Sequence, residues 1–282
     1  MYDEMIHSLR MAVLVDNLPG DGLEAEWGLS IYLEADGRCI LLDTGASDMF
    51  AENAARMGIS LQNAEAGVLS HAHYDHADGM ARFFKENDHA MFYLQETCRE
   101  TCYGENDDGS DKYIGIRPGI LETYQDRIAY VSGNAQILPG IWLIRHKKKD
   151  YQKIALENRL FIRGKNGKEP DDFSHEQSLV LRTEKGLVIL DSCSHTGVQN
   201  IVEEVREAMG EQKVFAYIGG MHLYRLSDMD IRKLAAYLQK ESIDCIYTGH
   251  CSSEHGFAVL QEQLGDRVLQ FRSGLTANRL QE

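Results

Sequence analysis

The chain has no run of apolar residues that approaches the roughly 20 residues a helix needs to span a membrane. Its first residues, MYDEMIHSLRMAVLVDN, contain acidic side chains and no long apolar segment, so they do not resemble a signal peptide. We therefore expect a cytoplasmic protein that does not enter a membrane.

Positive charge is scarce as well. The chain has 29 Lys and Arg against 44 Asp and Glu, for a net charge of −15. A broad nucleic-acid surface needs clustered basic residues, so we expect no nucleic-acid partner. The one basic run, RHKKKD at 145–150, suits a solvated loop or a contact with an anionic substrate. Six cysteines are too dispersed for a disulfide framework and predict reduced thiols.

Apolar β-branched segments alternate with amphipathic segments along most of the chain. We expect strands at 11–16, 29–35, 38–45 and 66–71, and helices at 48–58 and 78–87. Asp36-Gly37 predicts a tight hairpin between two of these strands. From residue 177 onward strands again alternate with helices. This order predicts an α/β protein in which sheets pack together with helices outside.

The region 96–170 differs from the rest of the chain. Its segment GENDDGSDKYIGIRPG at 104–119 is rich in Gly, Asp and Asn, which is typical of loops. No sustained periodic core is visible there. We expect residues 1–282 to form a single domain, with 96–170 as an irregular insertion that covers a site.

The segment SHAHYDHADG at 70–79 gathers four possible metal ligands into six positions directly after an apolar strand. His71 and His73 point to the same side of an extended chain, because side chains alternate along a strand. They can therefore share one metal ion. Asp75 and His76 follow at a turn and can face a second ion, and two such ions can clamp a hydroxide and the oxygens of a displacement.

The HAHYDH segment resembles the H-x-H-x-D-H signature of the metallo-β-lactamase superfamily, and LLDTG at 41–45 resembles the strand before it. The resemblance implies an αβ/βα sandwich, with four layers made of two mixed β-sheets and outer helices. It also implies that Asp43 supports the metal site by contacting the metal ligands and not the metal ions themselves. The final histidine of the family, which completes the second metal site, falls on His250 in YTGHCSSEHG.

The same resemblance places two more ligands. In SHEQSLVLRTEKGLVILDSC, His175 falls on the family's third histidine, and Cys193 falls on its bridging position. His195 lies two residues beyond Cys193 and is able to replace either ligand. A thiolate favours softer metals, and His73 stands where di-iron relatives carry Glu. We therefore expect two divalent metal ions, zinc first, with manganese or iron as alternatives.

Several segments together, including GGMHL, resemble the dihydropteroate-synthase-like branch of that superfamily and bring His222 near the site. The implied function is hydrolysis of a small phosphorylated or cyclic compound by a metal-bound hydroxide. A transferase that displaces diphosphate from a dihydropterin diphosphate with an aryl amine is the alternative. A metal or redox sensor without turnover is a third hypothesis.

These readings share a small anionic, phosphate-bearing substrate. Asp75 is expected to orient the nucleophile, and His195 or His222 to neutralise charge or protonate the leaving group. Basic residues of the insertion are expected to close over the anionic end of the substrate: Lys147, Lys148, Lys149 and Arg163.

Overall fold

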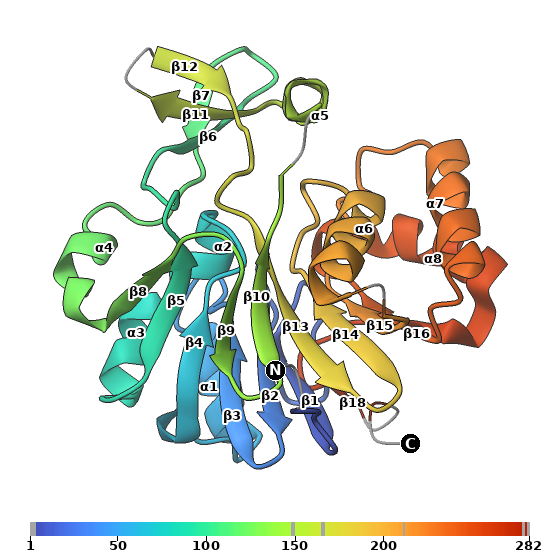
Figure 1. The fold of residues 1–282 in the computed structure, drawn as a ribbon. Coiled ribbons are helices and arrows are strands. Elements are labelled where there is room, and N and C mark those ends of the chain that lie inside the picture. Colours follow the sequence, from blue (N-terminus) through green and yellow to red (C-terminus); the bar gives the residue numbers. More distant parts are fainter. Residues whose placement is uncertain (1–3, 148–149, 165–166, 211, 278–279, 281–282) are drawn as a thin grey trace.

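The computed structural model describes residues 4–147, 150–164, 167–210, 212–277 and 280. Two seven-stranded sheets face each other, and helices cover the outer face of each sheet (Figure 1). The expected four-layer arrangement of an α/β protein is thus confirmed. No helix among the described residues is long and apolar enough to cross a membrane.

The first sheet contains, in spatial order, β18 (Thr276–Ala277), β1 (Leu9–Val15), β2 (Ser30–Ala35), β3 (Arg38–Leu42), β4 (Ala64–Val68), β5 (Met91–Gln95) and β8 (Ile128–Val131). Its outer face carries α1 (Met49–Arg56), α2 (Tyr74–Ala77), α3 (Met80–Glu86) and α4 (Ile120–Thr123), with short 3₁₀ turns η1 (Leu61–Asn63) and η2 (Gln125–Arg127). The β2–β3 hairpin turns at Asp36 and Gly37, both with positive φ, as the Asp-Gly pair predicts.

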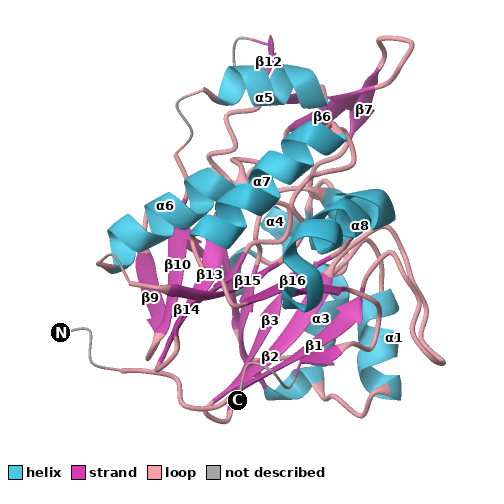
Figure 2. Cartoon of the chain, turned by 90° about the vertical axis from the view of Figure 1, so that its right-hand side faces the viewer, coloured by secondary structure: helices cyan, strands magenta, loops and turns pink. Residues whose placement is uncertain are grey.

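The second sheet contains, in spatial order, β17 (Val268–Gln270), β16 (Cys245–Thr248), β15 (Val214–Ile218), β14 (Gly186–Leu190), β13 (Gln177–Thr183), β10 (Ile141–Arg145) and β9 (Ala135–Leu138). Its outer face carries α6 (Val198–Met209), α7 (Asp228–Lys240) and α8 (Ser253–Leu264), best seen in Figure 2. The 3₁₀ turns η3 (His250–Ser252) and η4 (Gly265–Arg267) flank α8.

Side-chain alternation along the strands separates the layers. In β1, Met11 and Val13 face the core between the two sheets, whereas Ala12 and Leu14 pack on the helix side. A third apolar cluster lies between the second sheet and its helices. The two sheets therefore share one continuous apolar core. This core holds the ends of their strands in fixed positions.

Each sheet has antiparallel strands on one side and parallel strands on the other. The pairs β3–β4, β4–β5, β14–β15 and β15–β16 are parallel. Since parallel strands end at the same edge of a sheet, the loops after β3, β4, β14, β15 and β16 gather at one edge of the molecule. In open α/β sheets, ligands bind at the carboxyl ends of such strands.

The region 96–170, predicted as an insertion, contributes strands to both main sheets and forms a small sheet of its own. β8, β9 and β10 join the edges of the two main sheets. The remainder forms a third sheet in the order β12 (Gly167–Pro170), β11 (Leu160–Gly164), β6 (Cys102–Glu105) and β7 (Asp111–Tyr113), with α5 (Tyr151–Asn158) beside it. Figure 1 shows this small sheet standing above the edge where the main strands end.

Candidate metal centre

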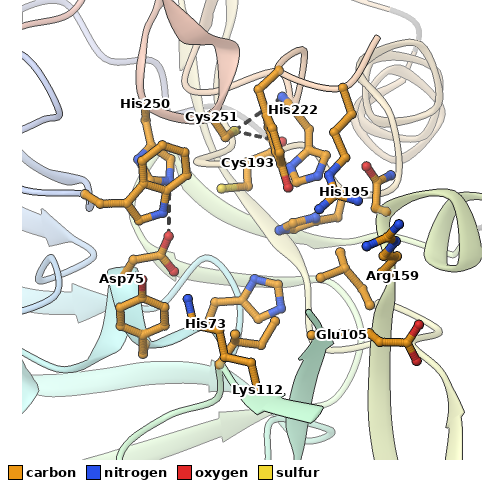
Figure 3. Close-up of a pocket in the computed structure, with 18 of the residues that line it drawn as sticks. His73, Asp75, Glu105, Lys112, Arg159, Cys193, His195, His222, His250 and Cys251 are labelled. Carbon is orange, nitrogen blue, oxygen red and sulfur yellow. Dashed lines mark hydrogen bonds and ion pairs between the residues drawn. The ribbon is translucent and has the colours of Figure 1, made fainter. Parts of the chain in front are cut away.

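The residues singled out from the sequence converge at this edge (Figure 3). Asp43 follows β3, and the segment 69–76 follows β4. From the second sheet, the segment 191–195 follows β14, and His250 follows β16. Each half of the chain thus supplies part of one cluster.

Three histidines, His71, His73 and His195, form what we call the first position. The ring centres of His71 and His73 are 4.6 Å apart, and the His195 ring lies 4.8 and 4.7 Å from them. The Nε2 atoms of all three are buried and have no hydrogen-bond partner among the described residues. An unpartnered buried polar atom costs about 1–3 kcal/mol. The arrangement therefore fits a metal ion held by three imidazoles.

The second position consists of Asp75, His76 and His250, whose ligand atoms lie within 4.8 Å of one another. Nε2 of His76 is 3.2 Å from Nε2 of His250, which is 3.4 Å from Oδ2 of Asp75. Cys193 Sγ is 3.2 Å from His76 Nε2, and the same thiol groups with His71. Cys193 therefore lies beside the second position and close to His71 of the first.

The Asp43 carboxylate orients two of these histidines. It accepts hydrogen bonds from His76 Nδ1 at 2.8 Å and from Ser70 Oγ at 2.6 Å. Because Ser70 gives its only proton to Asp43, it accepts from His71 Nδ1 at 2.8 Å. Both rings thus carry the proton on Nδ1 and turn an Nε2 lone pair toward the cluster. Metal-binding histidines are commonly held by such outer partners.

His250 is held in the same way by Asn17. Asn17 Oδ1 accepts from Gly28 N at 3.3 Å, which identifies it as the carbonyl oxygen, and it lies 3.0 Å from His250 Nδ1. The backbone N–H of His250 donates to Asp16 Oδ1 at 3.0 Å. His250 Nε2 is therefore free to face the second position.

The pKa shifts in the cluster keep His71 and His73 neutral and Asp75 charged, which are the forms that bind a metal ion. Burial, with repulsion from His76 and His73, lowers the pKa of His71 well below its usual value. Burial likewise lowers the pKa of His73 to about 3. Burial opposes the charge of Asp75, yet His76 and His250 hold the pKa of its carboxyl below the usual range. Burial also opposes the charge of His250, but its hydrogen bond to Asp75 raises its pKa to about 9, so metal binding there releases a proton.

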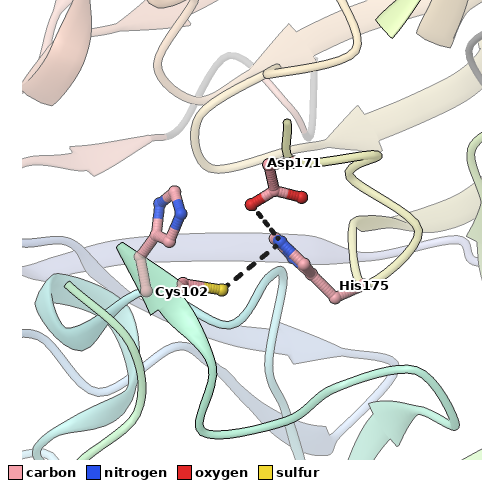
Figure 4. Close-up of side chains that lie close together, drawn as sticks. Cys102, Asp171 and His175 are labelled. Carbon is pink, nitrogen blue, oxygen red and sulfur yellow. Dashed lines mark hydrogen bonds and ion pairs between the residues drawn. The ribbon is translucent and has the colours of Figure 1, made fainter. Parts of the chain in front are cut away.

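His175, predicted as the third histidine, is not grouped with His71, His73 and His195; its ligand atom lies within 4.8 Å of those of His73, Cys102 and Asp171. Its Nδ1 accepts the N–H of Ala72 at 3.2 Å, so its proton is on Nε2. Nε2 lies 3.1 Å from Asp171 Oδ2 and 3.7 Å from Cys102 Sγ (Figure 4). Both ring nitrogens of His175 therefore have hydrogen-bond partners. Through its contact with the N–H of Ala72, His175 holds the backbone between His71 and His73 in place. We assign the third place in the first position to His195.

The loop 191–196, which carries Cys193 and His195, is fixed by two buried carboxylates. Glu176 accepts the backbone N–H groups of His195 at 2.6 Å and Thr196 at 2.8 Å. Asp191 accepts the N–H of Ser194 at 2.8 Å. These contacts satisfy backbone donors at a sharp turn and hold the ligands before any metal binds.

Four residues of the site have left-handed backbone conformations, which residues other than glycine rarely adopt. Their φ angles are 58° at Asp43, 57° at Ser194, 51° at His222 and 48° at His250. Strain of this kind costs on the order of 1–3 kcal/mol per residue and concentrates at functional sites. The backbone is thus bent at the points where it must aim side chains into the cluster.

A cavity of about 370 Å³ opens onto the cluster and is lined by His73, Asp75, Cys193, His195, His222 and His250. Its walls include Trp27, Tyr74 and Tyr224. Its mouth includes Lys112 on β7, Arg159 at the end of α5 and Arg225 in the loop after β15. The cavity has the size of a small-molecule site. Aromatic walls and a cationic mouth suit a planar substrate with an anionic end.

Comparison with known proteins agrees with this geometry. A model of the metallo-β-lactamase superfamily matches residues 28–131. A solved metal-dependent hydrolase of the β-lactamase superfamily, Tm1679, superposes with a TM-score of 0.82 at 25% identity, over 96% of this chain and 99% of that one. Residues 28–131 thus match the metallo-β-lactamase superfamily, and the chain as a whole has the metallo-β-lactamase fold.

A named relative within the superfamily is 7,8-dihydropterin-6-methyl-4-(β-D-ribofuranosyl)-aminobenzene-5'-phosphate synthase of Methanocaldococcus jannaschii. It is 25% identical over 267 residues, which cover 89% of each chain. A solved diphosphatase of the PhnP family shares the fold, with a TM-score of 0.52 at 13% identity over 96% of this chain and 98% of that one. The superfamily and its enzyme-named members support an enzyme that uses divalent metal ions.

Lys147 and Arg163, two of the basic residues expected to close over the site, do not line the cavity. Arg163 is half exposed and pairs with Asp111 at 2.6 Å, and the backbone N–H of Lys147 contacts Glu204 at 3.1 Å. Lys148 and Lys149 lie outside the described residues. The charges at the cavity mouth are instead Lys112, Arg159 and Arg225. No pattern in the sequence marks them, because they come from β7, from the end of α5 and from the loop after β15, which only the fold brings together.

His222 does reach the site, and both its ring nitrogens are buried without a partner among the described residues. Its ring centre is 4.6 Å from that of His195. Cys251, which the sequence suggests is a structural or surface residue, also lines the cavity. Cys251 directly follows the expected ligand His250 in the sequence, and this position could have indicated that it lies near the site.

Replacing Asp43 tests the orienting role. In Asp43→Asn, an amide group replaces one acceptor oxygen, so His71 and His76 lose their fixed tautomers. We expect metal affinity to fall by about 10–100-fold, measured as metal retained against a graded chelator, with the exposed Asp88→Asn as the control. Unchanged retention in Asp43→Asn would show that Asp43 does not orient the ligands.

The buried His146 predicts a pH dependence of stability. Burial opposes its charge, but the carboxylates of Asp191 and Glu204, with Glu176 nearby, raise its pKa to about 9. A raised histidine pKa stabilises the fold below its unfolded value of 6.5, and that contribution is lost as pH rises toward about 9. His146→Gln should therefore lower the free energy of unfolding by about 2–3 kcal/mol at pH 6 and by much less at pH 9.5.

The measurement is urea unfolding of the metal-loaded protein and the variant at both pH values. A deficit of equal size at pH 6 and pH 9.5 would mean that the charge of His146 contributes nothing and that only its packing matters.

Proposed function

We propose that this chain is a binuclear metal-dependent hydrolase of a small phosphate-bearing compound. The observation that carries the proposal is a set of buried imidazole nitrogens without partners, facing a cavity with a cationic mouth. His71, His73 and His195 would hold one ion, and Asp75, His76, Cys193 and His250 the other. Two such ions supply Lewis-acid polarisation of a phosphoryl group and lower the pKa of water.

The protein's own groups have separate roles in this proposal. The pKa of Asp75 is lowered, so its carboxylate is charged and can orient the attacking group through a hydrogen bond. His222 lines the cavity without belonging to either metal position, so it is the better of the two expected acids. His195 is occupied in the first position. His222 would give a proton to the leaving oxygen as the bond to phosphorus breaks.

The cavity mouth supports a phosphate-bearing substrate. Lys112 has no carboxylate partner in the part of the chain that the structure describes, and its Nζ lies 6.0 Å from the Tyr74 ring centre. Arg225 lies over Tyr224, 5.4 Å from the ring centre. Arg159 is already paired with Asp107 at 2.7 Å. Lys112 and Arg225 are therefore the cations best placed to bind an anionic group.

A transferase is the second candidate, and two observations favour it. The named relative from Methanocaldococcus jannaschii is a synthase whose product contains a pterin and an aminobenzene. Trp27 and Tyr224 are 48% and 41% exposed at the cavity, with ring centres 6.3 Å apart, and offer faces for planar rings. In that reaction an aryl amine would attack, and diphosphate would leave.

Metal removal and turnover test the hydrolase proposal. Protein purified without added metal should hold about two divalent ions per chain. Chelation should abolish release of phosphate or of an alcohol from phosphoesters, cyclic phosphates and pterin diphosphates, and zinc should restore it. Asp75→Asn should weaken the ion of the second position and should still lower kcat at least about 100-fold when excess zinc keeps both ions bound. Product that forms only when an aryl amine is present would favour the transferase, and bound metal with no turnover of any substrate would favour a sensor.

Lys112→Gln should raise KM for a phosphate-bearing substrate by about tenfold or more with little change in kcat, because a charge-assisted hydrogen bond to the substrate is lost. The exposed Lys85→Gln on α3 is the matched control for net charge. Steady-state kinetics at low and high salt measure the effect. Equal KM values for the two variants would place the anionic end of the substrate away from Lys112.

A further inference from the structure

The second position contains a sulfur atom beyond those that the family resemblance supplies. Cys193, His250 and Cys251 place their ligand atoms within 4.8 Å of one another, and both thiols are almost fully buried. Figure 3 shows the two sulfur atoms close together between His250 and His222. We propose that Cys251 is a second thiolate ligand, so that the second position selects a thiophilic metal ion such as zinc. This proposal rests on the metal centre proposed above.

The backbone is shaped to bring this sulfur to the cluster. His250 adopts a left-handed conformation and opens the 3₁₀ turn His250–Ser252, which folds Cys251 back toward the loop after β15. The N–H of Leu223 donates to the Cys251 carbonyl at 3.0 Å, and the N–H of Met221 donates to Ser252 Oγ at 2.8 Å. These hydrogen bonds therefore hold the loop after β15 and the turn 250–252 together around the Cys251 thiol.

Gly220 makes room for the sulfur. A Cβ atom added to Gly220 would lie 2.4 Å from Cys251 Sγ and 2.7 Å from the Ser192 carbonyl oxygen, so no other residue fits without displacing the thiol. The backbone N–H of His222 donates to the same sulfur at 3.3 Å. Charge-assisted N–H donors of this kind stabilise an anionic acceptor. The site is thus built to hold a thiolate at this point.

The two positions consequently differ in chemistry. The first has three imidazole nitrogens, which bind zinc, iron, manganese and other divalent ions with modest selectivity. The second combines a carboxylate, two imidazoles and two thiols, and sulfur ligands disfavour magnesium, calcium and manganese. Manganese would therefore be tolerated in the first position and disfavoured in the second.

A different reading is that Cys251 remains a thiol and donates to the Cys193 carbonyl oxygen, 3.6 Å from Sγ. That contact keeps the sulfur protonated and outside the metal sphere. The two readings differ in the number of thiolates that contact metal: two if Cys251 is a ligand, one if it is not.

Cobalt(II) counts these thiolates, because each Co–S bond adds to a charge-transfer absorption in the near ultraviolet. Protein stripped of metal under reducing conditions would be loaded with two equivalents of cobalt. Cys251→Ser and Cys251→Ala should each keep about half of the band intensity, as should Cys193→Ser, and the double variant should show none. Cys39→Ser is the control. Cys39 is half-buried on β3 and packs against the apolar cluster between the first sheet and its helices, away from the metal positions.

Band intensity in both Cys251 variants equal to that of the unmodified protein would overturn the proposal and leave Cys193 as the only thiolate. If two equivalents of cobalt bind without a charge-transfer band, the metal centre stands and the thiolate assignment fails. If no cobalt binds, the metal centre itself is wrong.

Zinc-edge X-ray absorption counts the sulfur ligands of zinc in the unmodified protein, so this test does not depend on whether a variant folds. With two zinc ions loaded, it should find about one sulfur per zinc on average, and half that value would contradict the assignment of Cys251. The preference for zinc over manganese should also drop by about tenfold or more in Cys251→Ala, measured by competitive dialysis.

Discussion

The site depends on one buried carboxylate, that of Asp43. It fixes the tautomer of His76 directly and that of His71 through Ser70, so two imidazoles present lone pairs to the same space. A neutral imidazole that rotates or changes tautomer presents an N–H instead, which repels a cation. The left-handed backbone at Asp43 shows that the chain accepts local strain to bring this carboxylate under both rings.

The centre also joins two halves of one fold. His71, His73, Asp75 and His76 follow β4 in the first sheet, whereas Cys193, His195, His250 and Cys251 follow strands of the second. Neither half has a complete ligand set for either metal position. A ligand that binds only the folded arrangement stabilises it by mass action. Metal binding would therefore hold the two sheets together at the edge where their shared apolar core ends.

The sequence predicted the layers and the main histidine cluster because both depend on local patterns. Alternation along strands, the Asp36-Gly37 turn and the spacing of His71, His73, Asp75 and His76 are visible over a few residues. The surroundings of His175 could not be predicted, because sequence order does not reveal that Ala72 and Asp171 contact its two ring nitrogens. Lys112, Arg159 and Arg225 could not be found, since they are far apart in the sequence and only the fold brings them together.

The placement of these cations has a consequence for substrate selection. The chain carries a net charge of −15, so most of its surface repels anions. At the cavity mouth, Lys112 and Arg225 lie free of carboxylate partners among the described residues, directly above the metal-binding cluster. In the proposed function, the overall negative charge would weaken the binding of a large polyanion, whereas Lys112 and Arg225 would attract a small phosphorylated molecule to the cavity.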